Sequence, residues 1–149
     1  MANLRFDHVG ITVADLDAAT AFFVTLGLEV EGTASMEGEF VDAVIGIPGS
    51  HSRIVVLRPP GGGAGVELST FVTPDHLPGS PAPMSNELGI RNVMFEVDDL
   101  SAVLDVLAAN GYGLVGDVGE QGGWRMAYVR GPEGIIVALA DQEAHTFDS

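Results

Sequence analysis

Apolar side chains recur along this chain at two spacings: every second residue in some stretches, and every third or fourth in others. Residues 4–13 (LRFDHVGITV) show the first spacing, which is typical of a β-strand with one buried face. The alternation places Asp7, Val9 and Ile11 on one face of this strand and His8 on the other. We expect the face with the β-branched residues to pack beneath a helix.

The second spacing follows directly and predicts a helix that begins after Asp15 and ends at Gly27. An Asp before the first helical turn accepts hydrogen bonds from amides that lack a partner there, and Gly readily adopts the conformation that ends a helix. The predicted apolar face of this helix consists of Leu16, Ala19, Phe22, Phe23 and Leu26.

This strand–helix unit occurs twice. Residues 92–111 align with residues 8–27 at an offset of 84 without a gap. The matched pairs are Val9 and Val93, Val13 and Val97, Asp15 and Asp99, Leu16 and Leu100, Ala18 and Ala102, and Gly27 and Gly111. A second offset, 71, matches Gly63, Val66, Glu67 and Leu68 with Gly134, Val137, Ala138 and Leu139. The chain is therefore predicted to contain two copies of one module.

The remaining patterns complete both modules. The first half is predicted to continue with a strand at 28–35, a short helix at 38–46, and strands at 52–59 and 65–71 around a PPGGG turn. The second is predicted to contain a strand at 90–97, a helix at 100–110, and strands at 112–118, 124–130 and 135–139. The predicted organisation is a first module at 1–72, a Pro-rich connector at 73–87, a second module at 88–141 and a tail at 142–149. The polar residues from Asp141 onward are expected to fray.

Each βαβββ module leaves a four-stranded sheet with a helix on one face only, so its other face still has to be covered. We therefore predict an α+β fold in which two modules form a curved mixed sheet around a concave cavity, with the helices outside. His8 faces that cavity because its neighbour Val9 faces the helix. Glu67 lies between Val66 and Leu68, so its carboxyl group faces the cavity too. There it needs a metal, an Arg or a His as a partner, or else it keeps its proton, which would suit proton transfer.

Composition narrows the possible functions. The chain has 21 acidic residues against six basic ones, all Arg, which gives a net charge of −15 and disfavours nucleic acid and anionic membranes as partners. The same charge favours neutral or cationic ligands. Since there is no Cys, disulfides, thiolate ligands and a Cys nucleophile are excluded. The N-terminus lacks the pattern of a secretion signal and no apolar run is long enough to span a membrane, so we expect a cytoplasmic protein.

The duplicated βαβββ layout, the opening FDHVGITVADLDAATAFFVTLGLEV, the GIPGSHSRIVVL and GVELS runs, and the closing YVRGPEGIIVAL resemble the vicinal oxygen chelate superfamily. That superfamily includes glyoxalases, type I extradiol dioxygenases, methylmalonyl-CoA epimerases and bleomycin-resistance proteins. The resemblance extends from about Leu4 to Ala140. It is specific for the fold, whereas the superfamily contains isomerases, lyases, dioxygenases, transferases and plain binding proteins.

In metal-dependent members, one residue from the first strand and one from the last strand of each module hold a divalent ion. The resemblance places His8 and Glu67 at these positions in the first module, where they are competent ligands for Mn, Fe, Ni or Zn. It places Asn92 and Ala138 at those of the second module. Asn92 offers a weak amide ligand and Ala138 offers none, so the ligand set departs from the pattern. This departure disfavours an extradiol dioxygenase, which needs two His and one carboxylate on iron.

Two hypotheses about function remain open. The first is a glyoxalase-type lyase or isomerase in which a divalent ion on His8, Glu67 and Asn92 polarises a small oxygenated substrate. Water, His51 or Glu96 would complete the ligand set, and Glu67 or Glu96 would transfer the proton. The second is a metal-free protein that binds a small molecule, similar to antibiotic-sequestering members, with His8 and Glu67 as a hydrogen-bonded pair. The residues predicted to line the cavity are Phe71, Met94, Trp124, Met126 and Tyr128. The resemblance also implies a homodimer.

Overall fold

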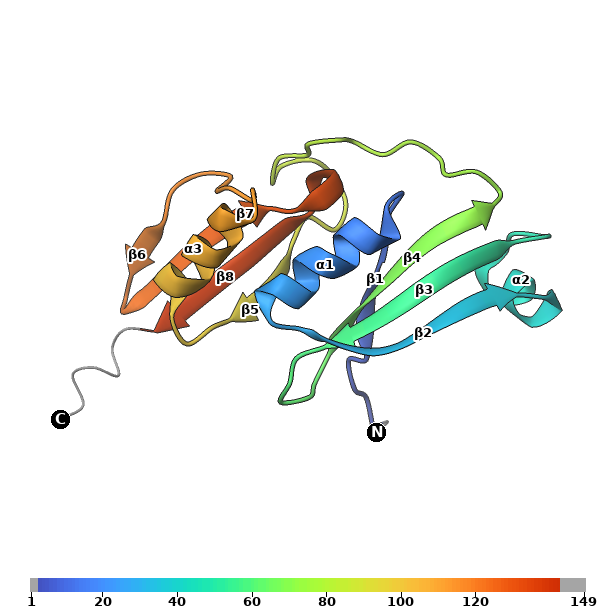
Figure 1. The fold of residues 1–149 in the computed structure, drawn as a ribbon, viewed down its shortest axis with the longest axis horizontal. Helices are drawn as coiled ribbons and strands as arrows, with labels where there is room; N and C mark the ends of the chain where they lie inside the picture. Colours follow the sequence, from blue (N-terminus) through green and yellow to red (C-terminus); the bar gives the residue numbers. More distant parts are fainter. Residues whose placement is uncertain (1–2, 143–149) are drawn as a thin grey trace. The chain divides into compact units, whose positions relative to one another are not determined.

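The computed structural model describes residues 3–142, which divide into two compact units, one ending at Gly79 and one beginning at Ser80 (Figure 1). Each unit contains one four-stranded mixed sheet. No helix among the described residues is long and apolar enough to cross a membrane. The predicted α+β class is therefore confirmed, with two curved sheets that do not close.

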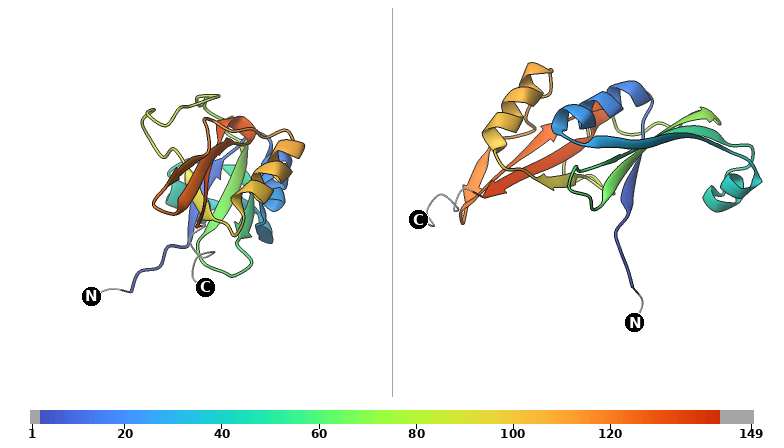
Figure 2. Two further views of the ribbon diagram at one scale, coloured as in Figure 1. Left: turned by 90° about the vertical axis from the view of Figure 1, so that its left-hand side faces the viewer. Right: turned by 60° about the horizontal axis from the view of Figure 1, so that its bottom comes forward.

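The sheet of the first unit has one long helix on one face. Its elements are β1 (His8–Thr12), α1 (Leu16–Leu26), β2 (Glu29–Glu37), α2 (Glu39–Ile45), β3 (His51–Arg58) and β4 (Gly65–Thr73). The strands lie in the order β1-β4-β3-β2, and β1 runs parallel to β4 while the other neighbours are antiparallel. The two views in Figure 2 show α1 lying along the sheet. The first strand of the unit, β1, is thus paired with the last one in sequence, β4.

The core of the first unit lies between α1 and this sheet. Phe22 and Phe23 are fully buried, and their rings meet edge to face with centroids 5.1 Å apart. Burial of each such side chain contributes about 1.5–3 kcal/mol. The sheet's buried apolar residues facing α1 are Val55, Leu57, Val66 and Leu68. Alternation then directs the intervening residues of β1, β3 and β4 to the face opposite α1.

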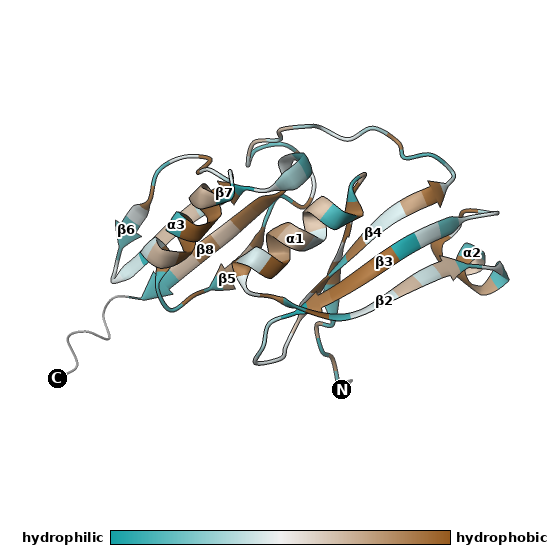
Figure 3. Ribbon diagram, viewed as in Figure 1, coloured by the Kyte–Doolittle hydropathy of each residue, from teal (hydrophilic) through white to brown (hydrophobic). Residues whose placement is uncertain are grey.

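The second unit has the same plan. Its elements are β5 (Val93–Glu96), α3 (Leu100–Ala109), β6 (Gly119–Gln121), β7 (Trp124–Arg130), a 3-10 turn (Pro132–Gly134) and β8 (Ile136–Gln142). The strand order is β5-β8-β7-β6, with β5 parallel to β8. Figure 3 shows β8 as hydrophobic along most of its length, and its residues from Ile136 to Asp141 are all buried. The core beneath α3 contains Leu100, Leu107, Val129, Val137 and Leu139.

The pairing of the strands reproduces both offsets found in the sequence. In the first unit Gly10 of β1 lies opposite Glu67 of β4, and in the second Met94 of β5 lies opposite Ala138 of β8. Gly10 and Met94 are related by the offset of 84, and Glu67 and Ala138 by the offset of 71. Each residue in these strands of one module therefore has a structural counterpart in the other, as the duplication predicts.

The starts of the long helices repeat as well. Asp15 accepts a hydrogen bond from the Ala18 amide at 3.0 Å, and Asp99 accepts one from the Ala102 amide at 3.1 Å. Both Asp residues have extended backbone conformations, as residues that cap a helix normally do. The predicted beginnings of both helices are confirmed.

One predicted strand was wrong. Residues 112–118 form no strand, and only Leu114 makes an isolated bridge, to Val129. The next strand, β6, begins at Gly119 and is three residues long. Glycines at 111, 113, 116 and 119 interrupt the apolar pattern, and Gly weakens a strand because it loses more conformational freedom on folding and has no side chain to pack.

Asp141 was expected to fray but is buried within β8, with 2% of its surface exposed. Its carboxylate accepts two hydrogen bonds from the guanidinium of Arg125 and one, at 2.7 Å, from the Leu100 amide at the start of α3. A buried carboxylate is stable only when it is paired in this way. Asp141 therefore ties α3 to the sheet. Residues 143–149 of the predicted tail lie outside the described residues.

We predict that Asp141→Ala lowers the free energy of unfolding by about 3 kcal/mol, because it leaves the partly buried Arg125 and the Leu100 amide without their partner. Asp99→Ala removes only a cap and should cost about 1 kcal/mol. Urea unfolding of both variants measures the two costs. An equal loss of unfolding free energy in the two variants would contradict this prediction, because it would show that the buried contact with Arg125 adds no stability beyond that of a helix cap.

The short helix α2 is held by a carboxylate rather than by a core. It has no buried residue, and Phe40 and Val44 are largely exposed. Asp42 accepts hydrogen bonds from the Gly49 amide at 2.8 Å, the Ser50 amide at 3.0 Å and the Ser50 hydroxyl at 2.6 Å. The Ser50 hydroxyl, followed by the Gly49 amide, lowers the pKa of Asp42 below its ordinary value.

This shift predicts how α2 responds to acid. Because the pKa of Asp42 is lowered on folding, its stabilising contribution is complete above the unfolded-state pKa and is lost as pH falls through the folded-state value. The amide proton shifts of Gly49 and Ser50 should therefore move together in one transition below about pH 4, the ordinary range of Asp. Asp42→Asn should abolish that transition. Movement of the two amides at higher pH in the wild type would contradict the assignment.

Candidate functional site

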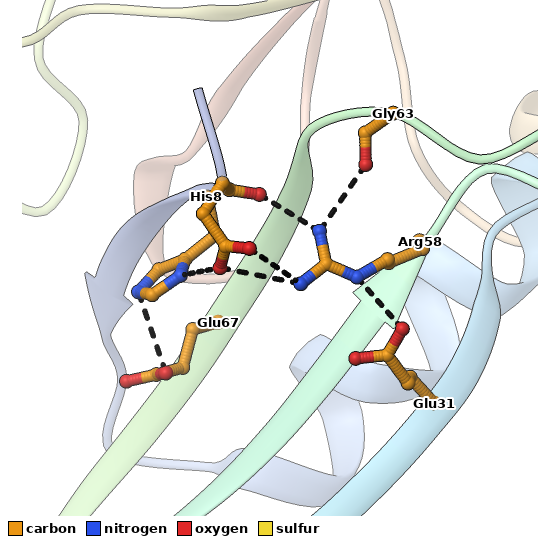
Figure 4. Close-up of polar contacts among 6 residues, drawn as sticks. His8, Glu31, Arg58, Gly63 and Glu67 are labelled. Carbon is orange, nitrogen blue, oxygen red and sulfur yellow. Dashed lines mark hydrogen bonds and ion pairs between the residues drawn. The ribbon is translucent and has the colours of Figure 1, made fainter. Parts of the chain in front are cut away.

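The face of the first sheet opposite α1 brings together two residues singled out in the sequence. His8 lies opposite Gly65 in the pairing of β1 with β4, and Glu67 lies two residues further along β4. Both side chains point to the same face because residues two apart in a strand share a face. His8 Nε2 lies 3.4 Å from Glu67 Oε2, and 35% and 29% of the two side chains are exposed (Figure 4).

The other ring nitrogen of His8 contacts a second carboxylate. Nδ1 lies 2.7 Å from Oδ2 of Asp7, a hydrogen-bonding distance. The sequence pattern had placed Asp7 on the helix-facing side, which was wrong, because β1 begins only at His8 and the alternation does not extend to Asp7. The imidazole of His8 is therefore located between two carboxylates.

Arg58, at the end of β3, holds Asp7 in place. Its Nη2 donates to both carboxylate oxygens of Asp7 at 3.2 Å, and its Nε donates to Glu31 Oε2 at 2.7 Å. Figure 4 shows the guanidinium between Glu31 and the His8 side of the cluster. The hydrogen bond with His8, and next the one with Arg58, lowers the pKa of Asp7 below its ordinary value. Hydrogen bonds with Glu31 and Asp7 raise the pKa of Arg58.

The chemistry of this cluster fits one side of a divalent metal site. Two ligand atoms that lie about 2.1 Å from one ion at a tetrahedral angle are about 3.4 Å apart, which is the separation of His8 Nε2 and Glu67 Oε2. Metal-binding His residues commonly donate their other ring N–H to a carboxylate, and Asp7 is placed to accept it. Among residues 3–142, no group of three or more His, Asp and Glu side chains is arranged to hold an ion.

The equivalent position in the second unit holds a neutral pair. Asn92 Nδ2 donates a long hydrogen bond, at 3.4 Å, to the hydroxyl of Tyr128. Tyr128 lies directly opposite Ala138 in the pairing of β7 with β8. Where the first unit has a carboxylate, at Glu67, the second thus has a methyl group flanked by a phenol ring.

The residues predicted to line a cavity are divided between the two units. Met94, Ala138 and Tyr128 form one row across the second sheet, and Trp124 and Met126 belong to the same face because they are an even number of residues from Tyr128. Glu96 lies in the next row of this face, opposite Ala140, and is exposed. Phe71 belongs to the first unit, where its ring meets that of His76 edge on at 6.2 Å.

His51 does not join the cluster around His8. It begins β3 opposite Glu37, and its Nε2 lies 2.7 Å from the Ser35 hydroxyl and 3.3 Å from Glu37 Oε2. Val56, which pairs with Glu67, is five residues further along the strand, a distance of about 17 Å. Within this unit His51 is therefore too far away to complete the ligand set.

Sequence reasoning missed Asp7, Arg58 and Glu31. One signal was available, since Arg58 follows the apolar run IVVL in a chain with only six basic residues. A cation directly after a buried strand, in a chain rich in acids, indicates an ion pair. Its partners are 51 and 27 residues away in sequence, so only the folded sheet identifies them.

Nearly the whole chain matches one family of known proteins. Residues 5–139 match the model of the Glyoxalase/Bleomycin resistance protein/Dioxygenase superfamily. A crystal structure of a glyoxalase family protein from Bacillus cereus has 37% sequence identity and a TM-score of 0.90, covering 95% of this chain and 96% of that one. No match was found among curated proteins.

Two more distant structures show the same fold. The trypanothione-dependent glyoxalase I of Leishmania major is 19% identical with a TM-score of 0.64, covering 98% of this chain and 91% of its own. TnmS3, an antibiotic-binding protein from Streptomyces sp. CB03234, is 21% identical with a TM-score of 0.61, covering 95% of this chain and 98% of its own. The family model matches residues 5–139, and the chain contains two βαβββ modules. The chain therefore belongs to the Glyoxalase/Bleomycin resistance protein/Dioxygenase superfamily.

Proposed function

We propose that the protein binds a divalent ion between His8 and Glu67 and uses it in a lyase or isomerase reaction on a small oxygenated substrate. The observation that carries this proposal is the approach of His8 Nε2 to Glu67 Oε2, at 3.4 Å, while Nδ1 of the same ring faces Asp7. A neutral imidazole that donates Nδ1–H to Asp7 directs the lone pair of Nε2 toward an anionic oxygen. Two acceptors facing each other require a cation between them, which is either a proton or a metal ion.

A metal ion suits this arrangement because both acceptors are ordinary ligands for Zn, Mn, Fe or Ni. The separation of 3.4 Å also matches the spacing of two ligand atoms bound to one ion. The exposed fractions of both side chains leave the pair accessible. Water would occupy the positions that His8 and Glu67 leave open.

When bound, such an ion would supply Lewis-acid stabilisation of negative charge on a substrate oxygen. The protein's own groups would do the rest. His8 and Glu67 would fix the position of the charge, and Asp7 would keep the imidazole oriented. Proton transfer is assigned to a carboxylate, Glu67 or Glu96. With a net charge of −15, the protein favours a neutral or cationic substrate.

A second candidate function is metal-free binding of a small molecule. It is favoured by the second unit, where Asn92 and Tyr128 hydrogen-bond to each other and Ala138 replaces a carboxylate. In that case the cation between His8 and Glu67 is a proton, and Met94, Trp124, Tyr128 and Phe71 supply apolar contacts. For either function we expect a homodimer, as the resemblance to the superfamily implies, in the cytoplasm.

The metal content of the purified protein separates these functions. Protein prepared without chelator should contain about one equivalent of Mn, Fe, Ni or Zn per chain, and both His8→Ala and Glu67→Ala should abolish it, because each removes one of two strong ligands. Elemental analysis measures the content. Added metal should also raise the Tm of the stripped wild type, since a ligand of the folded state stabilises it.

His51 and Glu37 provide a matched control. They form a second His–Glu contact, at 3.3 Å, on the same sheet, so His51→Ala should leave the metal content unchanged. Loss of metal in this variant would mean that binding is not specific to His8 and Glu67. Absence of metal from the wild type, with a Tm that is indifferent to added Mn, Ni or Zn, would rule out the metal-dependent enzyme and leave the binding protein.

A further inference from the structure

Arg58, in β3, uses every nitrogen of its guanidinium to bond to β2, to the residue before β1 and to a turn. Nε donates to Glu31 in β2, and Nη2 donates to the Asp7 carboxylate just before β1. Nη1 donates to the Asp7 carbonyl at 2.8 Å and to the Gly63 carbonyl, in the turn between β3 and β4, at 3.1 Å. The orientation of the guanidinium is therefore set by four separate acceptor groups. Asp7 is held both by its carboxylate and by its backbone.

The sequence makes room for this arrangement at Gly65. A Cβ atom at this position would lie 2.4 Å from the Leu57 carbonyl oxygen, 3.0 Å from Arg58 Cγ and 3.3 Å from Arg58 Nη1. The first distance is shorter than real Cβ contacts, so only Gly fits here. The Gly65 amide also donates to the Asp7 carbonyl at 2.8 Å. The absence of a side chain at Gly65 thus leaves space for the aliphatic part of Arg58, and the Gly65 amide adds a further hydrogen bond to the backbone of Asp7.

The position of the Asp7 carboxylate decides which nitrogen of His8 carries the proton. A carboxylate accepts a hydrogen bond but cannot donate one when ionised, so Nδ1 of His8 must be protonated wherever it bonds to Asp7. In a neutral ring, Nε2 then has a lone pair directed at Glu67. The opposite tautomer would direct a proton at Glu67 and could not bind a cation through Nε2.

We propose that Arg58 is a positioning residue that selects the metal-binding tautomer of His8 through Asp7. Arg58 touches neither His8 Nε2 nor Glu67, so it acts only through the carboxylate that it fixes. The role of the tautomer in binding a cation rests on the proposed function. The tautomer itself is a property of the metal-free protein and is measured separately.

The test combines one spectroscopic and one thermodynamic measurement on the full chain. Long-range ¹H–¹⁵N correlation spectra of metal-free protein at about pH 9, where imidazoles are neutral, report the tautomer of His8, assigned by comparison with His8→Gln. Calorimetric titration with Zn²⁺ gives the Kd. The variants are Arg58→Met and Asp7→Ala. The matched control is Glu31→Gln, which alters the other carboxylate bound by Arg58 and leaves Asp7 intact.

We expect the wild type and Glu31→Gln to carry the proton on Nδ1 of His8. Arg58→Met and Asp7→Ala should show a mixture of both tautomers, and their Kd for Zn²⁺ should rise by about tenfold or more, as is usual when a group that orients a metal ligand is removed. If Arg58→Met does not fold, Arg58→Lys replaces it, because Lys keeps the charge but cannot make the forked contact with Asp7.

A wild-type His8 protonated mainly on Nε2, or an unchanged tautomer in the Arg58 variant, would overturn the inference. Zn²⁺ binding that depends on His8 and Glu67 but not on Arg58 would overturn it while leaving the proposed function intact. An Nδ1–H tautomer that depends on Arg58, in a protein that binds no Zn²⁺, would support the selection of the tautomer and refute the metal-dependent function.

Discussion

The parallel pairing of the first and last strands is the constraint on which each unit depends. β1 lies beside β4, and β5 beside β8, so the chain must cross over the sheet and place its helix on one face. The same pairing fixes which residues meet on the other face. His8 and Glu67 are 59 positions apart in sequence, yet their side chains converge because the register sets Gly10 opposite Glu67. The parallel pairing of β1 with β4 therefore determines both the fold of the first unit and the position of the candidate site.

The two modules have the same strand register but carry different side chains at the equivalent positions. In the first, the row next to His8 includes a carboxylate at Glu67, and a third charged group, Asp7, is held nearby by Arg58. In the second, the same register sets Ala138 between Met94 and Tyr128. A methyl group leaves space above the strand for a larger neighbour, and the Tyr128 hydroxyl meets Asn92. Duplication thus preserved the backbone while the chemistry of the two faces diverged.

The sequence revealed the fold because the features that determine it are local or repeated. The Asp at each helix start, the apolar spacing of α1 and the internal repeat all lie within short stretches. It failed where a distant partner decides the outcome. Asp141 looked like a polar tail residue, and only Arg125 and the start of α3 explain its burial. Asp7 looked like a strand residue, and only Arg58 explains its position beside His8.

The same limit applied to the candidate site. His8 and Glu67 were predicted from strand alternation and the family resemblance, whereas Arg58 and Glu31 were not, because an ion pair between distant strands leaves no periodic pattern in sequence. The strand predicted at 112–118 failed for a different reason, since its apolar residues are separated by Gly residues that favour an irregular chain. Alternation alone overestimates strands in such segments.

Most of the few basic residues of this chain are engaged by acceptors within their own unit. Of the six Arg residues, Arg58, Arg91, Arg125 and Arg130 each bond to carboxylates or backbone carbonyls of their own unit. Arg53 shares the strand face of Val55 and Leu57, the face covered by α1, rather than the face of His8. The guanidinium of Arg58, which holds Asp7 beside His8, already has all its nitrogens bonded. The cluster around His8 therefore presents the carboxylates of Asp7 and Glu67, whereas the guanidinium of Arg58 is already engaged by acceptors of its own unit.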